Sequence, residues 1–192
     1  MTTGGLRGPD APTIRRMVRA RGGVVARVEA LPDGEVAYHV ELPSHRAKVE
    51  LLGDLATWDA RLPAVRRLAE LASAGARTPA EAAAAMQRYV QDRVRFAGEI
   101  GEVFSPALHT LAIGAGDCDD SARVLAAMMR SMGLRARLQT LPEDGAPLHV
   151  AAQALVGGRW TWYETTLRAR PGEHPVDAAR RLGVRVRPDL VG

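Results

Sequence analysis

The chain has 192 residues, a length that fits one compact domain with short appendages better than two full domains. One cysteine is present, which excludes an internal disulfide and with it the disulfide-stabilised class of small secreted proteins. The formal net charge is +4, but the arginines are spread along the chain without interleaved aromatic residues, so nucleic-acid binding is a minor alternative.

The N-terminal part, residues 1–44, predicts a lead segment followed by a β-hairpin. The first dozen residues are rich in Gly, Thr and Pro, which is typical of flexible chain. Two β-prone runs, 24–31 and 35–42, flank a Pro-Asp-Gly turn signal at 32–34. In the second run apolar and polar residues alternate, which predicts a strand with one apolar face.

The remaining residues, 45–192, form the second predicted unit and begin with helical patterns. Residues 45–74 carry apolar side chains at helical spacing, and Pro63 divides this run into two helices. A capping box at 78–81 surrounds a proline at the first helical position and predicts the start of a third helix. The stretch 96–116 is predicted to be mostly loop.

The second half of the chain predicts a helix that begins at the cysteine, then antiparallel strands and a short last helix. The helix spans 118–132 and ends at Gly133, a residue that suits a C-terminal cap. Hairpin, helices, thiol helix and antiparallel strands in this order indicate an α+β fold. The further predicted elements are a strand at 134–141, a turn at 143–147, a hairpin of 149–156 and 160–166 around Gly157-Gly158, a helix near 175–182 and an extended tail.

Cys118 lies in the run Gly116-Asp117-Cys118-Asp119-Asp120, at the start of the predicted helix. A helix N-terminus carries a partial positive charge that stabilises a thiolate, the nucleophilic form of cysteine. The backbone N–H of Cys118 could also donate to a developing oxyanion. The three aspartates oppose ionisation because their charges raise the thiol pKa, although Asp117 also suits the N-cap position. We therefore expect the thiol to need a basic partner; the alternative is a small, buried, inert cysteine.

His149 and Glu164 are the candidate partners of the thiol. His149 opens one strand of the second predicted hairpin and Glu164 lies on the other strand. If the strands pair around the short turn, the two residues fall at nearly opposite positions. A carboxylate there holds one imidazole nitrogen and fixes the tautomer, so the imidazole can serve an activated cysteine. The alternative is that Glu164 is a solvated strand residue and His149 a neighbour of the turn.

Together these residues resemble the core of the transglutaminase-like superfamily, over about residues 78–166. The upstream segments 89–96 and 105–111 resemble the lead-in of bacterial and bacteriophage members. The core resemblance is carried by the run 116–120 before an apolar helix, by Met132–Leu138, by His149-Val150 before a strand, and by Gly157–Trp160 with an acid at Glu164.

The resemblance implies a papain-like fold, in which a thiol-bearing helix packs on an antiparallel sheet. The implied activity is hydrolysis, transamidation or deamidation of an amide bond in a protein or peptide, with no metal or organic cofactor. Cys118 is then the nucleophile, His149 the base and Glu164 the third member of the triad. The residues that would support the site are Gly116, Asp117, Asp119 and Asp120.

Because of three departures from the family pattern, a catalytically weak or inactive member of the family remains an alternative. The third triad position is usually Asp, whereas this chain has Glu164, which is one methylene longer. Some members use an upstream aromatic or amide side chain in the oxyanion hole, and no residue here can be matched to it. Ser121 occupies a position where a larger polar residue is frequent.

The context of the protein is inferred from its last segment, because Gly172–Pro175 and Ala178–Gly183 resemble extensions of phage-encoded or prophage-like members. No apolar run approaches the roughly 18–20 residues of a membrane span, and Met1–Gly8 lacks a signal-peptide stretch. We therefore expect a soluble protein, cytoplasmic in a bacterium or carried in a phage-like particle, with phage tail or particle proteins as further partners. The alternative function is a structural or assembly component of such a particle with a weak or vestigial site.

Overall fold

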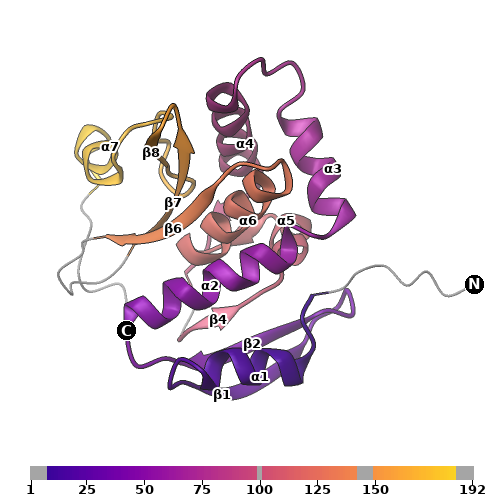
Figure 1. Ribbon diagram of the computed structural model, residues 1–192. Coiled ribbons are helices and arrows are strands. Elements are labelled where there is room, and N and C mark those ends of the chain that lie inside the picture. Colours follow the sequence, from indigo (N-terminus) through magenta and orange to yellow (C-terminus); the bar gives the residue numbers. More distant parts are fainter. Residues whose placement is uncertain (1–7, 99–100, 142–148, 185–192) are drawn as a thin grey trace, which may run out of the picture.

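The computed structural model describes residues 8–98, 101–141 and 149–184 (Figure 1). The predicted N-terminal hairpin is confirmed, since β1 (Val24–Ala30) and β2 (Val36–Glu41) pair antiparallel. A short strand from later in the chain, β4 (Val103–Phe104), pairs with the other edge of β2. The hairpin is therefore joined to the rest of the chain by strand pairing.

A helix that was not predicted, α1 (Ala11–Arg19), precedes the hairpin and packs against β1. The carboxylate of Asp10 caps this helix by accepting a hydrogen bond from the Thr13 N–H at 2.9 Å. Ile14 and Val18 bury its apolar side. The aspartate cap and a proline in the first turn are both helix-start signals, and the Gly- and Pro-rich composition around them masked the pattern.

Three helices follow the hairpin close to their predicted bounds. Thr78 caps the third of them, because its hydroxyl accepts a hydrogen bond from the Glu81 N–H at 3.2 Å. The Glu81 carboxylate accepts from the Arg77 N–H at 2.7 Å, so the return bond of the predicted capping box falls one residue before the cap. The helices are α2 (His45–Asp59), α3 (Pro63–Ala72) and α4 (Pro79–Arg93).

The stretch predicted as loop contains β4 and three other short elements, β3 (Arg95–Phe96), α5 (Ala107–Ile113) and β5 (Ala115–Gly116). β3 and β5 pair in parallel, with Phe96 opposite Gly116. α5 ends at Gly114, whose φ of 64° favours glycine. Elements this short carry no periodic pattern, but they fix the path by which the chain enters the thiol helix.

The thiol helix, α6 (Cys118–Ser131), lies at the centre of the molecule (Figure 1). It packs against β6 (Ala136–Leu141) and β7 (His149–Val156), and it also contacts α2, α3, α4 and α5. β8 (Arg159–Tyr163) completes this sheet in the order β6-β7-β8, with both pairs antiparallel. The predicted α+β architecture, a thiol-bearing helix on an antiparallel sheet, is confirmed.

The core predicted beneath the site is also confirmed. Leu134 is partly buried and packs against the core, and the other predicted residues are buried. Burying one Leu, Val or Met side chain contributes about 1.5–3 kcal/mol, so this core holds the start of α6 firmly against the sheet. The buried residues are Leu125, Ala126, Met129, Leu138, Val150 and Ala152.

The chain after β8 folds back on that strand through a loop and α7 (Pro175–Arg181), which lies beside β8 in Figure 1. The ring of Trp162 meets the ring of His174 edge-on at 5.0 Å. The helix predicted near 175–182 is therefore confirmed. The predicted turn at 143–147 and the tail beyond 184 lie outside the described residues.

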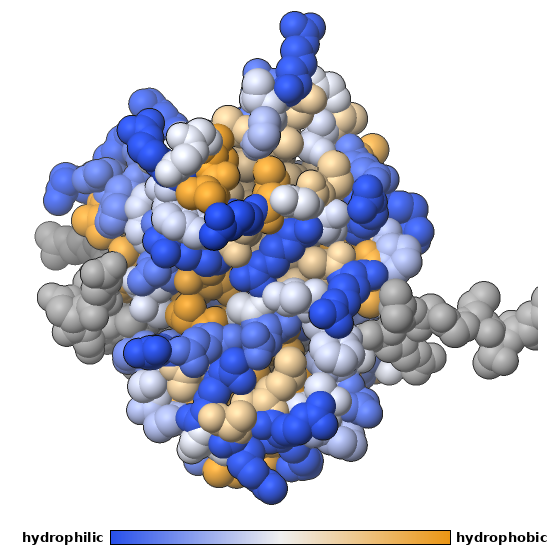
Figure 2. Space-filling view, in the orientation of Figure 1, coloured by the Kyte–Doolittle hydropathy of each residue, from blue (hydrophilic) through white to orange (hydrophobic). Residues whose placement is uncertain are grey.

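The face shown in Figure 2 is mostly hydrophilic, and its apolar side chains are scattered among polar ones. No helix in the described ranges combines the length and the apolar character needed to cross a membrane. The large apolar side chains that are exposed are Val24, Leu71, Phe96 and Ile113 on four separate elements, and Val176, Leu182 and Val184 in or just after α7.

Candidate active site

Cys118 is the first residue of α6, as predicted, and Asp117 is the N-cap. The Asp117 carboxylate accepts hydrogen bonds from the N–H groups of Asp119 at 2.8 Å and Asp120 at 3.0 Å. Gly116 is required here, because a Cβ at this position would lie 2.8 Å from the Asp120 Cβ. The glycine and the cap together fix the turn that carries the thiol into the helix.

His149 and Glu164 are brought together by the β7–β8 hairpin. β8 ends at Tyr163, so Glu164 directly follows this strand and does not lie within it as predicted. Ala152 pairs with Tyr163, and the same register continued places Glu164 across from Ala151. His149 is two residues further along and on the same face, which makes the pair diagonal rather than opposite. A diagonal pair is farther apart than a direct one and needs a long side chain. The extra methylene of Glu, compared with Asp, suits this geometry.

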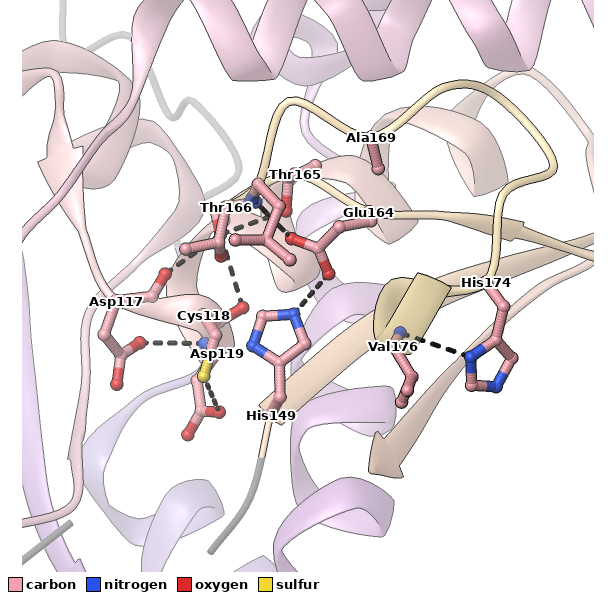
Figure 3. Close-up of polar contacts among 12 residues, drawn as sticks. Asp117, Cys118, Asp119, His149, Glu164, Thr165, Thr166, Ala169, His174 and Val176 are labelled. Atoms are coloured by element: carbon pink, nitrogen blue, oxygen red, sulfur yellow. Dashed lines mark hydrogen bonds and ion pairs between the residues drawn. The ribbon is translucent and has the colours of Figure 1, made fainter. Parts of the chain in front are cut away.

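The Glu164 carboxylate accepts a hydrogen bond from the His149 Nε2 (Figure 3). It is completely buried, and its second oxygen accepts from the N–H groups of Thr166 at 2.5 Å and Leu167 at 2.9 Å. With Nε2 donating to the carboxylate, Nδ1 is the acceptor nitrogen of the neutral imidazole. The solvated-carboxylate alternative for Glu164 is therefore wrong.

The sulfur of Cys118 lies next to the start of β7, because it accepts a hydrogen bond from the backbone N–H of Val150. The thiol also donates to Asp119 Oδ1 at 3.6 Å. In Figure 3 the imidazole of His149 stands between Glu164 and Cys118, with Nε2 toward the carboxylate and the other ring nitrogen toward the sulfur. The three residues singled out in the sequence thus converge from a helix start and two strand ends.

Burial raises the pKa of the Cys118 thiol well above its usual value, and the charges of Asp119 and Asp117 raise it further. The Val150 N–H and the charge of Lys48 lower it, but by less. Asp117 and Asp119 thus oppose ionisation as predicted, and the helix N-terminus alone does not produce a thiolate. Ionisation of Cys118 depends on the positive groups around it.

His149 is a group of the site that can supply such a charge. Burial disfavours its imidazolium form, but the hydrogen bond and charge of Glu164, with the charges of Asp119 and Asp117, outweigh burial and raise the His149 pKa. The imidazolium is therefore stabilised inside the site, which suits a group that takes up a proton during a reaction.

Two carboxyl groups of the first turn of α6 are also perturbed. Burial raises the pKa of Asp119 to about 7 and that of Asp120 to about 7, in both cases helped by the charge of Asp117. Asp119 is paired with Lys48, whose Nζ lies 2.5 Å from its Oδ2. Lys48 was not among the residues predicted for the site, although it is the only lysine of the chain and lies on the apolar face of α2.

Asp120 predicts a pH-dependent contribution to stability. An unfolded aspartate ionises near pH 4, whereas folded Asp120 keeps its proton to about pH 7. Asp120 therefore favours folding in acid, and this contribution is lost as the pH rises from about 4 through about 7. The difference between the two pKa values corresponds to about 4 kcal/mol.

The Asp120→Asn variant lacks this titration. We expect its free energy of unfolding, relative to the wild type, to increase by up to about 4 kcal/mol between pH 4 and pH 8. Urea denaturation of both proteins at several pH values measures the difference. A difference that does not change with pH would mean that Asp120 ionises normally in the folded protein.

Asp117, Cys118 and Asp119 place three possible metal-ligand atoms within 4.8 Å of one another. These groups already serve other bonds in the described structure. Asp117 caps α6, while the two oxygens of Asp119 contact the Cys118 thiol and Lys48. We therefore assign no metal to this group.

Two glutamines of α4, which were not predicted for the site either, hold the main chain around Glu164. Gln87 Nε2 donates to the carbonyls of Glu164 at 2.8 Å and Ala169 at 3.1 Å. Gln91 Nε2 donates to the carbonyls of Glu164 and Leu167, each at 2.8 Å. A polar side chain at i and i+4 on an otherwise apolar helix face was the available signal.

A hydroxyl contact ties the same loop to the thiol helix. Thr165 Oγ1 donates to Ser121 Oγ at 3.0 Å, and Ser121 Oγ donates to the Asp117 carbonyl at 2.9 Å. Ser121 and Thr165 are both buried. The small Ser121, noted as a departure from the family pattern, therefore links the loop after Glu164 directly to the first turn of α6.

Comparison with solved structures supports the fold. A candidate protease from Parabacteroides distasonis is 13% identical, with a TM-score of 0.53 over 73% of this chain and 30% of that chain. A candidate cysteine protease from Cytophaga hutchinsonii is 20% identical, with a TM-score of 0.49 over 60% and 39% of the two chains. A TGase is 12% identical, with a TM-score of 0.45 over 88% and 50%. This chain thus covers half or less of each of these three proteins. Only the match to the Parabacteroides distasonis protein has a TM-score above 0.5, and it supports the fold alone.

The family comparison is more specific. No curated protein sequence matches the chain. The model of the transglutaminase-like superfamily matches residues 66–165, which are 100 of the 192 residues and include Cys118, His149 and Glu164. With this match and its papain-like α+β fold, the chain belongs to the transglutaminase-like superfamily.

Proposed function

We propose that the protein is a cysteine hydrolase or acyl-transferring enzyme that acts on an amide bond of a protein or peptide. Cys118 is the nucleophile, His149 the general base and acid, and Glu164 the residue that orients His149. The observation that carries the proposal is the buried Glu164 carboxylate on His149 Nε2, with the Cys118 sulfur held by the next residue, Val150. This arrangement follows the general logic of an activated nucleophile.

The reaction begins when His149 takes the thiol proton and the Cys118 sulfur attacks the carbonyl carbon. The backbone N–H of Cys118, at the start of α6, is the predicted donor to the oxyanion of the tetrahedral intermediate. The intermediate collapses to a thioester as His149 gives its proton to the leaving amine. Water then yields an acid, or a second amine yields a new amide. Asp117 and Gly116 keep the turn in place during both steps.

One observation favours the alternative function, a structural or assembly component with a weak or vestigial site. The pKa of Cys118 is raised by burial and by Asp119 and Asp117, so few molecules hold a thiolate at neutral pH. A raised pKa slows attack but does not prevent it, because cysteine is an intrinsically strong nucleophile and His149 can accept its proton in the transition state.

An activated ester separates the two functions without knowledge of the natural substrate. We expect p-nitrophenyl acetate to acetylate Cys118 in the wild type, with a burst of p-nitrophenol equal to the protein concentration. The Cys118→Ala variant should show no burst and no acetylated peptide by mass spectrometry. Equal release by both proteins would contradict the proposal. Adding an amine during the slow phase shows whether water or the amine resolves the thioester.

The biological setting is a further part of the proposal: a bacteriophage or prophage origin, with location in the bacterial cytoplasm or in a phage-like particle. Its support is the resemblance of the segments 89–96, 105–111, 172–175 and 178–183 to bacterial and phage-type members. Genes for head or tail proteins beside this one would support it. A gene set with unrelated housekeeping enzymes in every occurrence would count against it.

A further inference from the structure

Lys48 is a buried cation in the body of the protein. It lies on α2 at a position three residues before Leu51 and seven before Leu55, both of which are buried in the core. Its side chain is only 11% exposed. Burying an ammonium group is unfavourable unless anions face it. The only lysine of the chain therefore depends on anionic partners at this position.

The partners of Lys48 lead to the thiol. Its Nζ lies 2.5 Å from Asp119 Oδ2 and 2.6 Å from Glu102 Oε2. The other oxygen of Asp119 accepts the hydrogen bond from the Cys118 thiol at 3.6 Å. Lys48 thus holds one side of a carboxylate whose other side touches the nucleophile.

We propose that Lys48 is a positioning residue for Cys118, which neutralises the Asp119 carboxylate and keeps it turned toward the thiol, so that a thiolate can form among acidic groups. The inference rests on the proposed role of Cys118 as nucleophile. Lys48 acts through Asp119 and through its own charge and is assigned no contact with the substrate.

The charges around the thiol explain why a cation is needed there. Carboxylates face it from the first turn of α6, and the imidazole of His149 is the other basic group at the start of β7. The charge of Lys48 lowers the Cys118 pKa, whereas those of Asp119 and Asp117 raise it. The charged groups that act on the thiol are Asp117, Asp119 and Lys48, and those that act on its ionisable neighbours Asp119, Asp120 and His149 include Glu102, Arg123 and Glu164.

The chemistry of lysine fits this place. Nζ contacts three carboxylate oxygens. They are Asp119 Oδ2, Glu102 Oε2 and, at 2.9 Å, Glu102 Oε1. A compact ammonium group has three donors for three acceptors, which a planar guanidinium would meet less well in so small a space. Asp119 and Glu102 together outweigh burial and raise the Lys48 pKa, so this residue stays charged throughout the pH range of the experiments below.

The test is the rate of Cys118 alkylation by iodoacetamide, a neutral reagent, as a function of pH in the full chain. We expect Lys48→Met to raise the midpoint pH of the alkylation profile by about one unit. At a fixed pH below the midpoint, alkylation of this variant is then about tenfold slower than that of the wild type. Asp119→Asn should move the midpoint down, and the double variant should fall between the two. Each unfolding free energy is measured by urea denaturation.

A merely structural Lys48 predicts a different pattern, namely a less stable protein with the wild-type alkylation profile. That result for Lys48→Met overturns the inference. If Lys48→Met does not fold, Asp119→Asn and the double variant give the same comparison, because the double variant removes both buried charges. If Asp119→Asn and the double variant both keep the wild-type midpoint, the inference is also overturned, because neither charge then acts on the thiol. A wild-type Cys118 that never reacts with the activated ester defeats the proposed function instead, whatever the Lys48 variants do.

Discussion

Replacing His149 with alanine is expected to slow the acetylation of Cys118 by p-nitrophenyl acetate by about 10²–10⁴-fold. The thiol pKa is raised by burial and by Asp119 and Asp117, so the proton must pass to a base during attack. His149 is held by Glu164 with its acceptor nitrogen toward the sulfur. Without it, the reaction depends on the small fraction of free thiolate, and the rate should rise about tenfold for each pH unit.

The matched control for this variant is His39→Ala. His39 also forms a histidine–glutamate pair, with Glu29 Oε2 at 2.9 Å, but in the N-terminal hairpin. The His39→Ala variant loses the same kind of histidine–glutamate pair, but at a place away from the thiol. Its burst rate should therefore equal that of the wild type. If His149→Ala and His39→Ala acetylate at equal rates, His149 takes no part in the reaction.

Replacing Glu164 with glutamine is expected to slow the same acetylation by about 10–10³-fold. An amide can donate to Nε2, which moves the ring proton to Nδ1 and leaves the wrong tautomer facing the thiol. In serine triads the corresponding change costs about 10⁴-fold, and we expect less here because cysteine is the better nucleophile. The carboxylate charge that stabilises the imidazolium is lost as well.

Glu164→Asp tests the diagonal geometry of the pair. Because the shorter side chain does not span the diagonal as well, we expect a loss in rate with Asp also, although the charge is kept. Unfolding free energies are needed for both variants, since Glu164 also accepts the Thr166 and Leu167 N–H groups. Glu29→Gln is the control. Wild-type rates for both Glu164 variants would remove Glu164 from the site and leave at most a Cys118–His149 dyad.

The local parts of the site could be predicted from the sequence. The run Gly116 to Asp120 carries its own cap and its own turn, and the cap predicted at Asp117 is present. The hairpin was predictable because Gly157 and Gly158 form a two-residue turn, with φ of 57° and 77°. The register set by that turn pairs His149 with position 166, so the diagonal offset of Glu164 was also predictable from the turn.

The parts that were missed depend on contacts between distant segments. Lys48 meets Asp119 only because α2 packs against α6, and no pattern near either residue encodes that packing. The bond from Gln87 to the Glu164 carbonyl spans 77 residues in the same way. α5 and the two-residue strands were missed because they are too short to show a period.

The combined variant His149→Ala with Glu164→Gln tests the central claim, that Glu164 acts on Cys118 through His149. Its acetylation rate by p-nitrophenyl acetate is compared with those of both single variants. If Glu164 only orients His149, its replacement has no further effect once His149 is removed. The double variant should therefore react as slowly as His149→Ala and no slower. A rate lowered by the product of the two single effects would contradict the account, because Glu164 and His149 would then act independently.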